Sequence, residues 1–426
     1  MPGIIEFPTV VEQALKDFCD LFGNEPARRH LAEYLTGLLV AERKTVNGIN
    51  SEFAVTTDQS CLNRWITEVG WDKQAVNLRR LRWLQGFPDT RYATHGVIPI
   101  DNVLIDHAGQ FIEDVGWLWD HADQRNVIAH DYLIANYVCP SDKHYALEFR
   151  RFRKKEDCDF ARQCLEEAPG GVAAATPEQV RLTHFKDHTQ LFQELVEWVV
   201  AQGIPGDFTF DCYFTSAATL NHIQKQQRRY VGDLKFNRKV RFQGKDMHAS
   251  EVAALIDSDD RQPVQVGDTR YWYFTKTIRI SEVDHPVRLV ILWDRKSGKQ
   301  PVKMLITNRT FWEVTRIVRV YRHRWTGTET LHRDGKQCLG MADCQLRSGE
   351  GQTRHMYLVL LVHSLLMAQL RHCRAYDWAT TTLTTIGEAR RAVLRETLRK
   401  TITWAIDRAT QDQWQTERIT THLALA

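Results

Sequence analysis

An apolar run with carboxylates inside it, residues 97–106, restricts the fold of this chain more than any other segment. It reads VIPIDNVLID and directly follows Gly96. A continuous apolar run of this length is typical of a strand buried on both faces, as in α/β proteins whose sheet is covered by helices. A second, shorter run at 208–211 also ends in an aspartate. The sequence therefore predicts an α/β fold with acidic side chains on two buried strands.

The segments around these strands have other periodicities. From 18 to 85, apolar residues recur every three and four positions, as in amphipathic helices. Further strand-like runs cover 127–138 and 145–152, short strands and turns cover 230–307, and the pattern from 310 is helical almost to the end. These patterns divide the chain into an all-helical N-terminal region at 1–92, a region with buried strands at 93–229, a β-rich segment at 230–308, and a helical region at 309–426.

The charge balance gives no overall attraction to nucleic acid. The chain has 56 Lys and Arg against 53 Asp and Glu, a net charge of +3, so contact with DNA has to come from local clusters. One such cluster is the basic run at 225–245, in which Asp233 is the single acid. Trp272 and Trp293 could stack on an unpaired base, although core positions are the commoner role for such residues.

Other features exclude classes of protein. The nine cysteines, from Cys19 to Cys373, are odd in number and include no Cys-x-x-Cys pair, which fits neither a disulfide framework nor a structural zinc site. The spacing of His121, His130 and His144 matches no common zinc pattern. The first residues do not resemble a signal peptide, and no apolar run is long enough to cross a bilayer, so we expect a cytoplasmic protein without a membrane partner.

The segment 321–336, YRHRWTGTETLHRDGK, carries the most informative pattern in the chain. Phosphodiester cleavage by metal ions needs carboxylates that hold hard divalent cations, together with cations that bind the phosphates. Here one carboxylate, Glu329, lies among Tyr321, Arg324 and Lys336. With Asp101 and Asp211 on buried strands, the chain has the three acids that such chemistry requires.

This segment resembles the signature of the DDE (Asp-Asp-Glu) transposases of bacterial insertion sequences, in the subgroup defined by Tyr, Arg, Glu and Lys at set spacings. The residues that follow it, 339–348, resemble the continuation seen in one branch, and the order of Asp101 and Asp211 agrees. The resemblance spans nearly the whole chain. It implies an RNase H-like catalytic core at 93–229 and 309–426, which is interrupted by a β-rich insertion at 230–308. It also implies that the helical region 1–92 is a DNA-binding domain and that helices end the chain. It also implies two magnesium ions, which manganese can replace, and double-stranded DNA as partner, both terminal inverted repeats and target.

The resemblance also implies roles for single residues. Asp101, Asp211 and Glu329 match the metal ligands and catalytic acids of the family, and Tyr321, Arg324 and Lys336 match its contacts to the phosphates around the cleaved end. This chain departs from the family in two places. Four residues instead of three separate Arg324 from Glu329, and Asn102 follows Asp101 where many relatives have a second acid. Asp106 is therefore the alternative to Asp101 as first carboxylate.

The function implied by this resemblance is cleavage of transposon ends followed by joining of the freed 3′ hydroxyl to target DNA. A homodimer in the synaptic complex and association with the nucleoid when bound to DNA are expected on the same basis. Two other functions remain open at this point: a domesticated DNA-binding protein that no longer cuts, and a structure-specific nuclease on the same fold.

Overall fold

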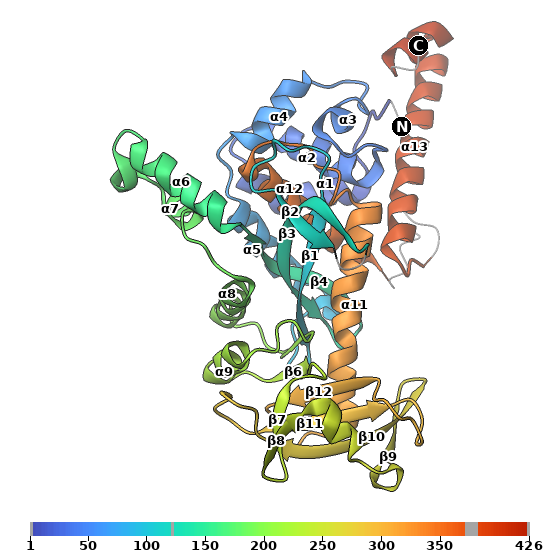
Figure 1. The fold of residues 1–426 in the computed structure, drawn as a ribbon. Helices are drawn as coiled ribbons and strands as arrows, with labels where there is room; N and C mark the ends of the chain where they lie inside the picture. Colours follow the sequence, from blue (N-terminus) through green and yellow to red (C-terminus); the bar gives the residue numbers. More distant parts are fainter. Residues whose placement is uncertain (1–2, 121–122, 371–381, 424–426) are drawn as a thin grey trace. The chain divides into compact units, whose positions relative to one another are not determined.

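A computed structural model describes residues 3–120, 123–370 and 382–423 (Figure 1). His121 and Cys373, which were considered above, lie outside the described residues. The chain divides into two compact units. The first consists of Met1–Arg91, Leu104–His130 and Leu331–Ala426, and the second of Tyr92–Val103 and Asp131–Thr330.

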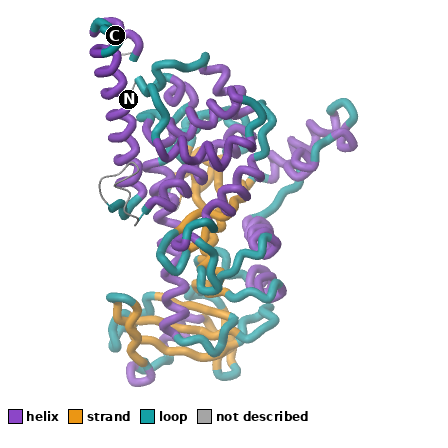
Figure 2. The backbone as a smooth tube through the Cα atoms, turned by 180° about the vertical axis from the view of Figure 1, so that it is seen from behind, coloured by secondary structure: helices purple, strands orange, loops and turns teal. Residues whose placement is uncertain are grey.

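The first unit is mainly helical, as the tube in Figure 2 shows. Its helices are α1 (Thr9–Phe18), η1 (Cys19–Leu21), α2 (Glu25–Val40), α3 (Val46–Asn50), α4 (Gln59–Thr67), α5 (Lys73–Leu84), η2 (Pro88–Thr90), α12 (Gly349–Gln369), α13 (Ile386–Thr410) and α14 (Thr416–His422). Polar side chains cap the N-termini of several of these helices. Asn24 caps α2 by accepting a hydrogen bond from the backbone N–H of Ala27, and Asp72 caps α5 in the same way. The predicted helical pattern of residues 18–85 is thus confirmed.

Helix α12 lies at the centre of the first unit. Its side chains are buried along nearly its whole length, and it contacts α2, α4, α5 and α13. From Met356 to Met367 the helix is mostly apolar on every side, which suits a helix that neighbours surround. Among the described residues, no helix combines the length and the apolar character needed to span a membrane.

The second unit is built on a mixed sheet. Its strands are β1 (Val97–Asp106), β3 (Arg125–Val138), β4 (His144–Phe152), β5 (Asp207–Phe210), β6 (Tyr230–Asp233), β9 (Gln262–Val266), β10 (Thr269–Ile278), β11 (Val287–Trp293) and β12 (Lys303–Thr307). β1 belongs to this unit up to Val103, and β3 belongs to it from Asp131. They follow the order β4-β3-β1-β5-β6-β12-β11-β10-β9. β1, β5 and β6 run parallel to one another, whereas β12 pairs antiparallel with β6. In the first unit, β2 (Gly116–Asp120) pairs antiparallel with the start of β3.

Helices cover both faces of this sheet. α8 (His188–Ala201) lies against β4 and beside α9 (Ala217–Lys225), and Phe192 of α8 packs 5.3 Å from Phe210 of β5 between ring centroids. α11 (Val314–Cys338), whose residues up to Thr330 belong to this unit, lies on the other face (Figure 1). The remaining elements are α6 (Lys155–Glu167), η3 (Gly171–Ala174), α7 (Pro177–Leu182), α10 (Ala249–Ala254), η4 (Ser258–Asp260), and the hairpin of β7 (Lys239–Phe242) and β8 (Lys245–His248).

Two aromatic residues considered for base stacking have different surroundings. Trp293 is fully buried and lies under the guanidinium of Arg261, whose Cζ is 4.0 Å from the ring centroid, so it belongs to the core. Trp272 is half-buried, with Arg270 and Lys296 near its ring. In the basic run, Lys239 and Arg241 alternate with buried residues on β7 and are exposed.

Candidate functional site

Three aspartates lie at the same level on three neighbouring parallel strands. Continuing the register of β1 and β5 by two residues beyond its last pair brings Asp101 beside Asp211. Continuing the register of β5 and β6 by one residue brings Asp211 beside Asp233. Aligned residues of parallel neighbours point to the same face of a sheet. The strands therefore gather Asp101, Asp211 and Asp233 on one face.

Helix α11 crosses this same face. Near its start, Ile317 and Val318 belong to the apolar cluster that includes residues of β11 and β12. Further along, the hydroxyl of Tyr321 donates a hydrogen bond of 3.3 Å to Oδ2 of Asp233 on β6. The next turn brings Arg324 to Asp101 on β1, where Nη1 and Oδ2 are 2.6 Å apart. The helix thus passes from β12 towards β1 and carries its side chains over the three aspartates.

Gly327 sets how closely α11 approaches the sheet. A Cβ at this position would lie 2.4 Å from Cγ of Pro99 on β1 and 2.7 Å from Cγ2 of Val138 on β3. Carbon atoms in contact are normally about 3.5–4.0 Å apart, so any side chain here would push the helix away. The glycine is therefore needed for the short contact between Arg324 and Asp101.

Asp101 is a buried carboxylate with one cationic partner. Only 8% of the residue is exposed. Burial raises the pKa of Asp101 to about 7, Asp211 and Glu329 contribute to the rise, and Arg324 opposes it. Its Oδ1 also accepts a hydrogen bond of 3.0 Å from the backbone N–H of Asn102. The negative charge around Asp101 is thus only partly compensated, which favours a bound cation.

Asn102 and Asp131 fix β1 from the opposite face of the sheet. Nδ2 of Asn102 donates a hydrogen bond of 3.2 Å to Oδ1 of Asp131, and Nε2 of His188 lies 2.8 Å from Oδ2 of the same carboxylate. Successive residues of a strand point to opposite faces, so these hydrogen bonds hold β1 in place on the face opposite to Asp101.

Asp211 directly follows β5, which ends at Phe210, and begins the turn into α9. Its Oδ1 accepts a hydrogen bond of 2.9 Å from the backbone N–H of Tyr213, and its side chain is half-buried. The hydroxyl of Thr215 lies 3.1 Å from the carbonyl oxygen of Asp211 and donates at 2.6 Å to the carbonyl oxygen of Asp233. Thr215 thereby ties the ends of two adjacent strands together.

Glu329 belongs to an uninterrupted part of α11, since the helix is continuous from Val314 to Cys338. The four residues that separate Arg324 from Glu329 therefore lie in continuous helix. Thr328, where the usual spacing would place the glutamate, is fully buried, and its hydroxyl donates a hydrogen bond of 2.7 Å to the carbonyl oxygen of Arg324. Glu329 is half-buried and, within the described part of the chain, forms neither a hydrogen bond nor an ion pair through its side chain.

Asp233 is a fourth carboxylate of this face, and it is not among the residues that the sequence predicts for the site. Its Oδ2 lies 3.0 Å from Nζ of Lys303, and Tyr321 donates to the same oxygen. Burial disfavours the charge of Lys303, but the Asp233 carboxylate outweighs it and raises the pKa of Lys303. The apolar run 230–233, which ends in an acid as 208–211 does, was the signal that could have identified Asp233.

The other predicted residues lie apart from this set. Lys336 is exposed on the part of α11 that belongs to the first unit. Asp106, the alternative first carboxylate, also belongs to the first unit, where it pairs with Arg125 at 3.3 Å. The second unit therefore brings together Asp101, Asp211, Tyr321, Arg324 and Glu329.

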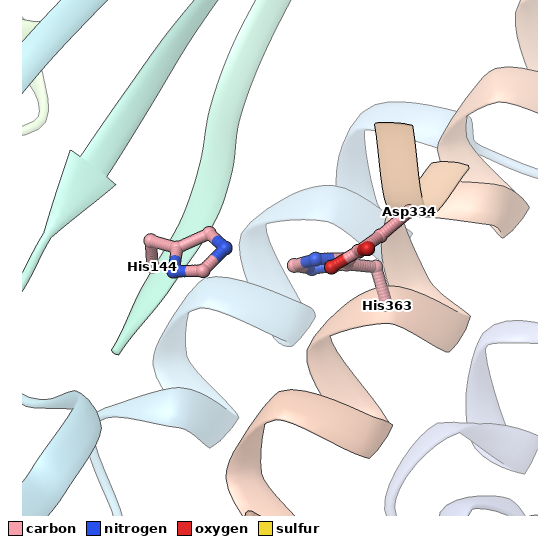
Figure 3. A group of neighbouring side chains, drawn as sticks. All are labelled: His144, Asp334 and His363. Carbon is pink, nitrogen blue, oxygen red and sulfur yellow. The ribbon is translucent and has the colours of Figure 1, made fainter. Parts of the chain in front are cut away.

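Figure 3 shows His144, Asp334 and His363. Ligand atoms of Asp334 on α11 and His363 on α12, both in the first unit, lie within 4.8 Å of each other, whereas His144 belongs to the second unit. Two side chains are fewer than a protein zinc site uses. We assign no metal to them.

Comparison with known families agrees with this chemistry. The sequence matches the family described as DDE superfamily endonuclease over residues 17–255 and the family described as transposase DDE domain over residues 185–365. No curated protein matches the chain. The first match covers more than half of the 426 residues and includes Asp101, Asp211 and Asp233, and the second includes Tyr321, Arg324 and Glu329. The chain therefore belongs to the DDE superfamily of endonucleases and is a DDE transposase.

Proposed function

We propose that this transposase cleaves the ends of an insertion sequence and joins the 3′ hydroxyl to target DNA, with Asp101, Asp211 and Glu329 as its catalytic acids. The observation that carries the proposal is the alignment of Asp101 with Asp211 on adjacent strands, beneath a helix that brings Arg324 and Glu329 to the same face. DNA is the partner on which transposases act, and retention of all three acids argues against a protein that only binds it.

The donor set fits magnesium, with manganese as a substitute. All the candidate ligands are carboxylates, which hard divalent cations prefer, and DDE nucleases use divalent metals. Two such ions, when bound, activate the attacking oxygen and stabilise the leaving one. Asp101, Asp211 and Glu329 would hold them. Arg324 balances the charge of Asp101, while Tyr321 and Lys336 are proposed to contact DNA phosphates.

The fold supports the wider proposal. The order β4-β3-β1-β5-β6, with β1, β5 and β6 parallel, is the strand arrangement expected of an RNase H-like core. Because β6 (Tyr230–Asp233) is one of these core strands, the insertion expected at 230–308 would begin only after Asp233 and end before α11. Residues 1–92 would form a DNA-binding domain. We extend the proposal to the Tyr-Arg-Glu-Lys subgroup, to a synaptic homodimer on inverted repeats and target DNA, and to a cytoplasmic enzyme associated with the nucleoid.

Cleavage of a labelled duplex that carries the ends of the element, with magnesium, tests this function. Glu329→Gln keeps the volume of the side chain but removes its charge, and we expect it to lower cleavage at least about a hundredfold while DNA binding is retained. Glu313→Gln is the matched control, because Glu313 is an exposed acid just before α11. Equal cleavage by Glu329→Gln and the wild type would refute the triad, and binding without cleavage by the wild type would favour a binding-only protein.

A further inference from the structure

The ion pair of Asp233 and Lys303 lies on the catalytic face, and nothing in the proposed chemistry uses it so far. Asp233 stands level with Asp211 on the neighbouring strand, and β12, which begins at Lys303, pairs with β6 so that Leu305 lies beside Asp233. Tyr321 of α11 contacts the same carboxylate. The pair is thus bound to two strands and to the helix that carries Glu329.

The two partners differ in exposure. The side chain of Asp233 is 12% exposed, whereas that of Lys303 is 40% exposed. Nζ of Lys303 also lies 5.5 Å from the centroid of the Tyr321 ring, an arrangement in which the aromatic face attracts the ammonium. A buried carboxylate and a ring therefore fix a cation that reaches solvent at the edge of the site.

An ammonium group held in this way suits a phosphate. It has three N–H donors, and the contacts to Asp233 and Tyr321 leave capacity for an oxygen from outside. Fixing the long side chain in advance also removes much of the entropy cost of binding. The face that DNA approaches carries four carboxylates, and Arg324 is occupied by Asp101. An additional cation is needed there to offset repulsion of the DNA backbone.

We propose that Lys303 is a further DNA phosphate contact of the active site and that Asp233 is the residue that positions it. This inference rests on the proposed function, because it takes the transposon end as the ligand. It gives Asp233 a role apart from the metal ligands: the carboxylate orients the ammonium of Lys303 and the phenol of Tyr321.

The first test is the salt dependence of binding to a labelled duplex with the ends of the element, in EDTA so that no cleavage occurs. Loss of one phosphate contact makes the slope of log affinity against log salt shallower by about 0.9. We expect this change for Lys303→Gln, and recovery of the wild-type slope for Lys303→Arg. Lys276→Gln is the control, because Lys276 is exposed on β10 of the same sheet. A wild-type slope for Lys303→Gln would overturn the inference.

The second test separates positioning from charge balance. Asp233→Asn keeps the shape of the side chain, and we expect single-turnover cleavage to fall about tenfold or more while DNA binding is no weaker. If Asp233 only neutralises Lys303, the variant binds DNA more tightly and cleaves at the wild-type rate, which would refute positioning. Thermal melting of each variant shows that it is folded. A wild-type chain that binds the duplex but never cuts it refutes the proposed function, whereas the salt slopes still decide the role of Lys303.

Discussion

Nη1 of Arg324 lies 2.6 Å from Oδ2 of Asp101, so a cation of α11 compensates a carboxylate that β1 holds in the interior. Arg324 opposes the rise in the pKa of Asp101, so without it the buried carboxyl either stays charged without a partner or takes up a proton, and the ion pair is lost. We expect Arg324→Gln to lower the free energy of unfolding by on the order of 2 kcal/mol at neutral pH in metal-free buffer. The measurement is urea denaturation. The double variant Arg324→Gln, Asp101→Asn should recover most of the loss, and strictly additive effects would contradict the pairing.

The close approach at Gly327 gives a second prediction. Gly327→Ala adds a methyl group where Pro99 and Val138 leave no room, so we expect a loss of stability of roughly 1–3 kcal/mol despite the better helix propensity of alanine. Cleavage should fall as well, because the helix that carries Glu329 has to move. Trp325→Ala, a change at an exposed position on the same helix, controls for stability. A more stable Gly327→Ala variant would show that α11 does not contact β1 so closely.

The position of the glutamate on α11 can be tested by exchange. Thr328 is fully buried, and a carboxylate there would lose its hydration without a partner. The variant Thr328→Glu, Glu329→Thr restores the usual family spacing, yet we expect it to be less stable than Glu329→Thr alone and equally inactive in the cleavage assay. If the double variant cleaved DNA, a glutamate at position 328 would be able to act in catalysis, and the assignment of the catalytic glutamate to position 329 would be wrong.

A pH effect is expected in the helical unit, at His355 of α12. Its Nδ1 lies 2.8 Å from the hydroxyl of Tyr34, its Nε2 lies 2.9 Å from the carbonyl oxygen of Gly340, and burial lowers its pKa from 6.5 to about 4. Between these two values the unfolded chain binds a proton that the folded chain does not. The stability that neutral His355 provides is therefore complete above pH 6.5 and is lost as the pH falls towards 4.

The variant His355→Gln isolates this effect, since glutamine can hydrogen-bond but does not titrate. The difference in unfolding free energy between wild type and variant should fall by on the order of 3 kcal/mol from pH 7 to pH 4. Urea denaturation at several pH values measures it. A constant difference would show that His355 is not held neutral.

Local sequence patterns predicted much of the fold. The apolar run at 97–106 has the same bounds as β1, and the helical periodicity of 18–85 matches α2 to α5, because both patterns reflect burial of nearby residues. The β-rich character of 230–307 was also read correctly. The sequence did not indicate that β6 runs parallel to β5, since strand order depends on contacts between distant segments.

The candidate site was predicted less completely, for the same physical reason. A signature within one helix indicated Tyr321, Arg324 and Glu329, and strand patterns indicated Asp101 and Asp211. In the sequence Asp233 is only a lone acid in a basic run, because its position in the site depends on register with Asp211 and on contact with Lys303, seventy residues away. Pairings of this kind are properties of the folded sheet and not of any window of sequence.

The order of the site residues along the chain has a consequence for its synthesis. Asp101, Asp211 and Asp233 lie on strands that are translated before α11, whereas Arg324 and Glu329 arrive only with that helix. A nascent or prematurely terminated chain that ends before α11 leaves Asp101 without its guanidinium partner and lacks one of the three acids. If the three acids act as proposed, such a chain does not cut DNA, and cleavage requires that synthesis continues through α11.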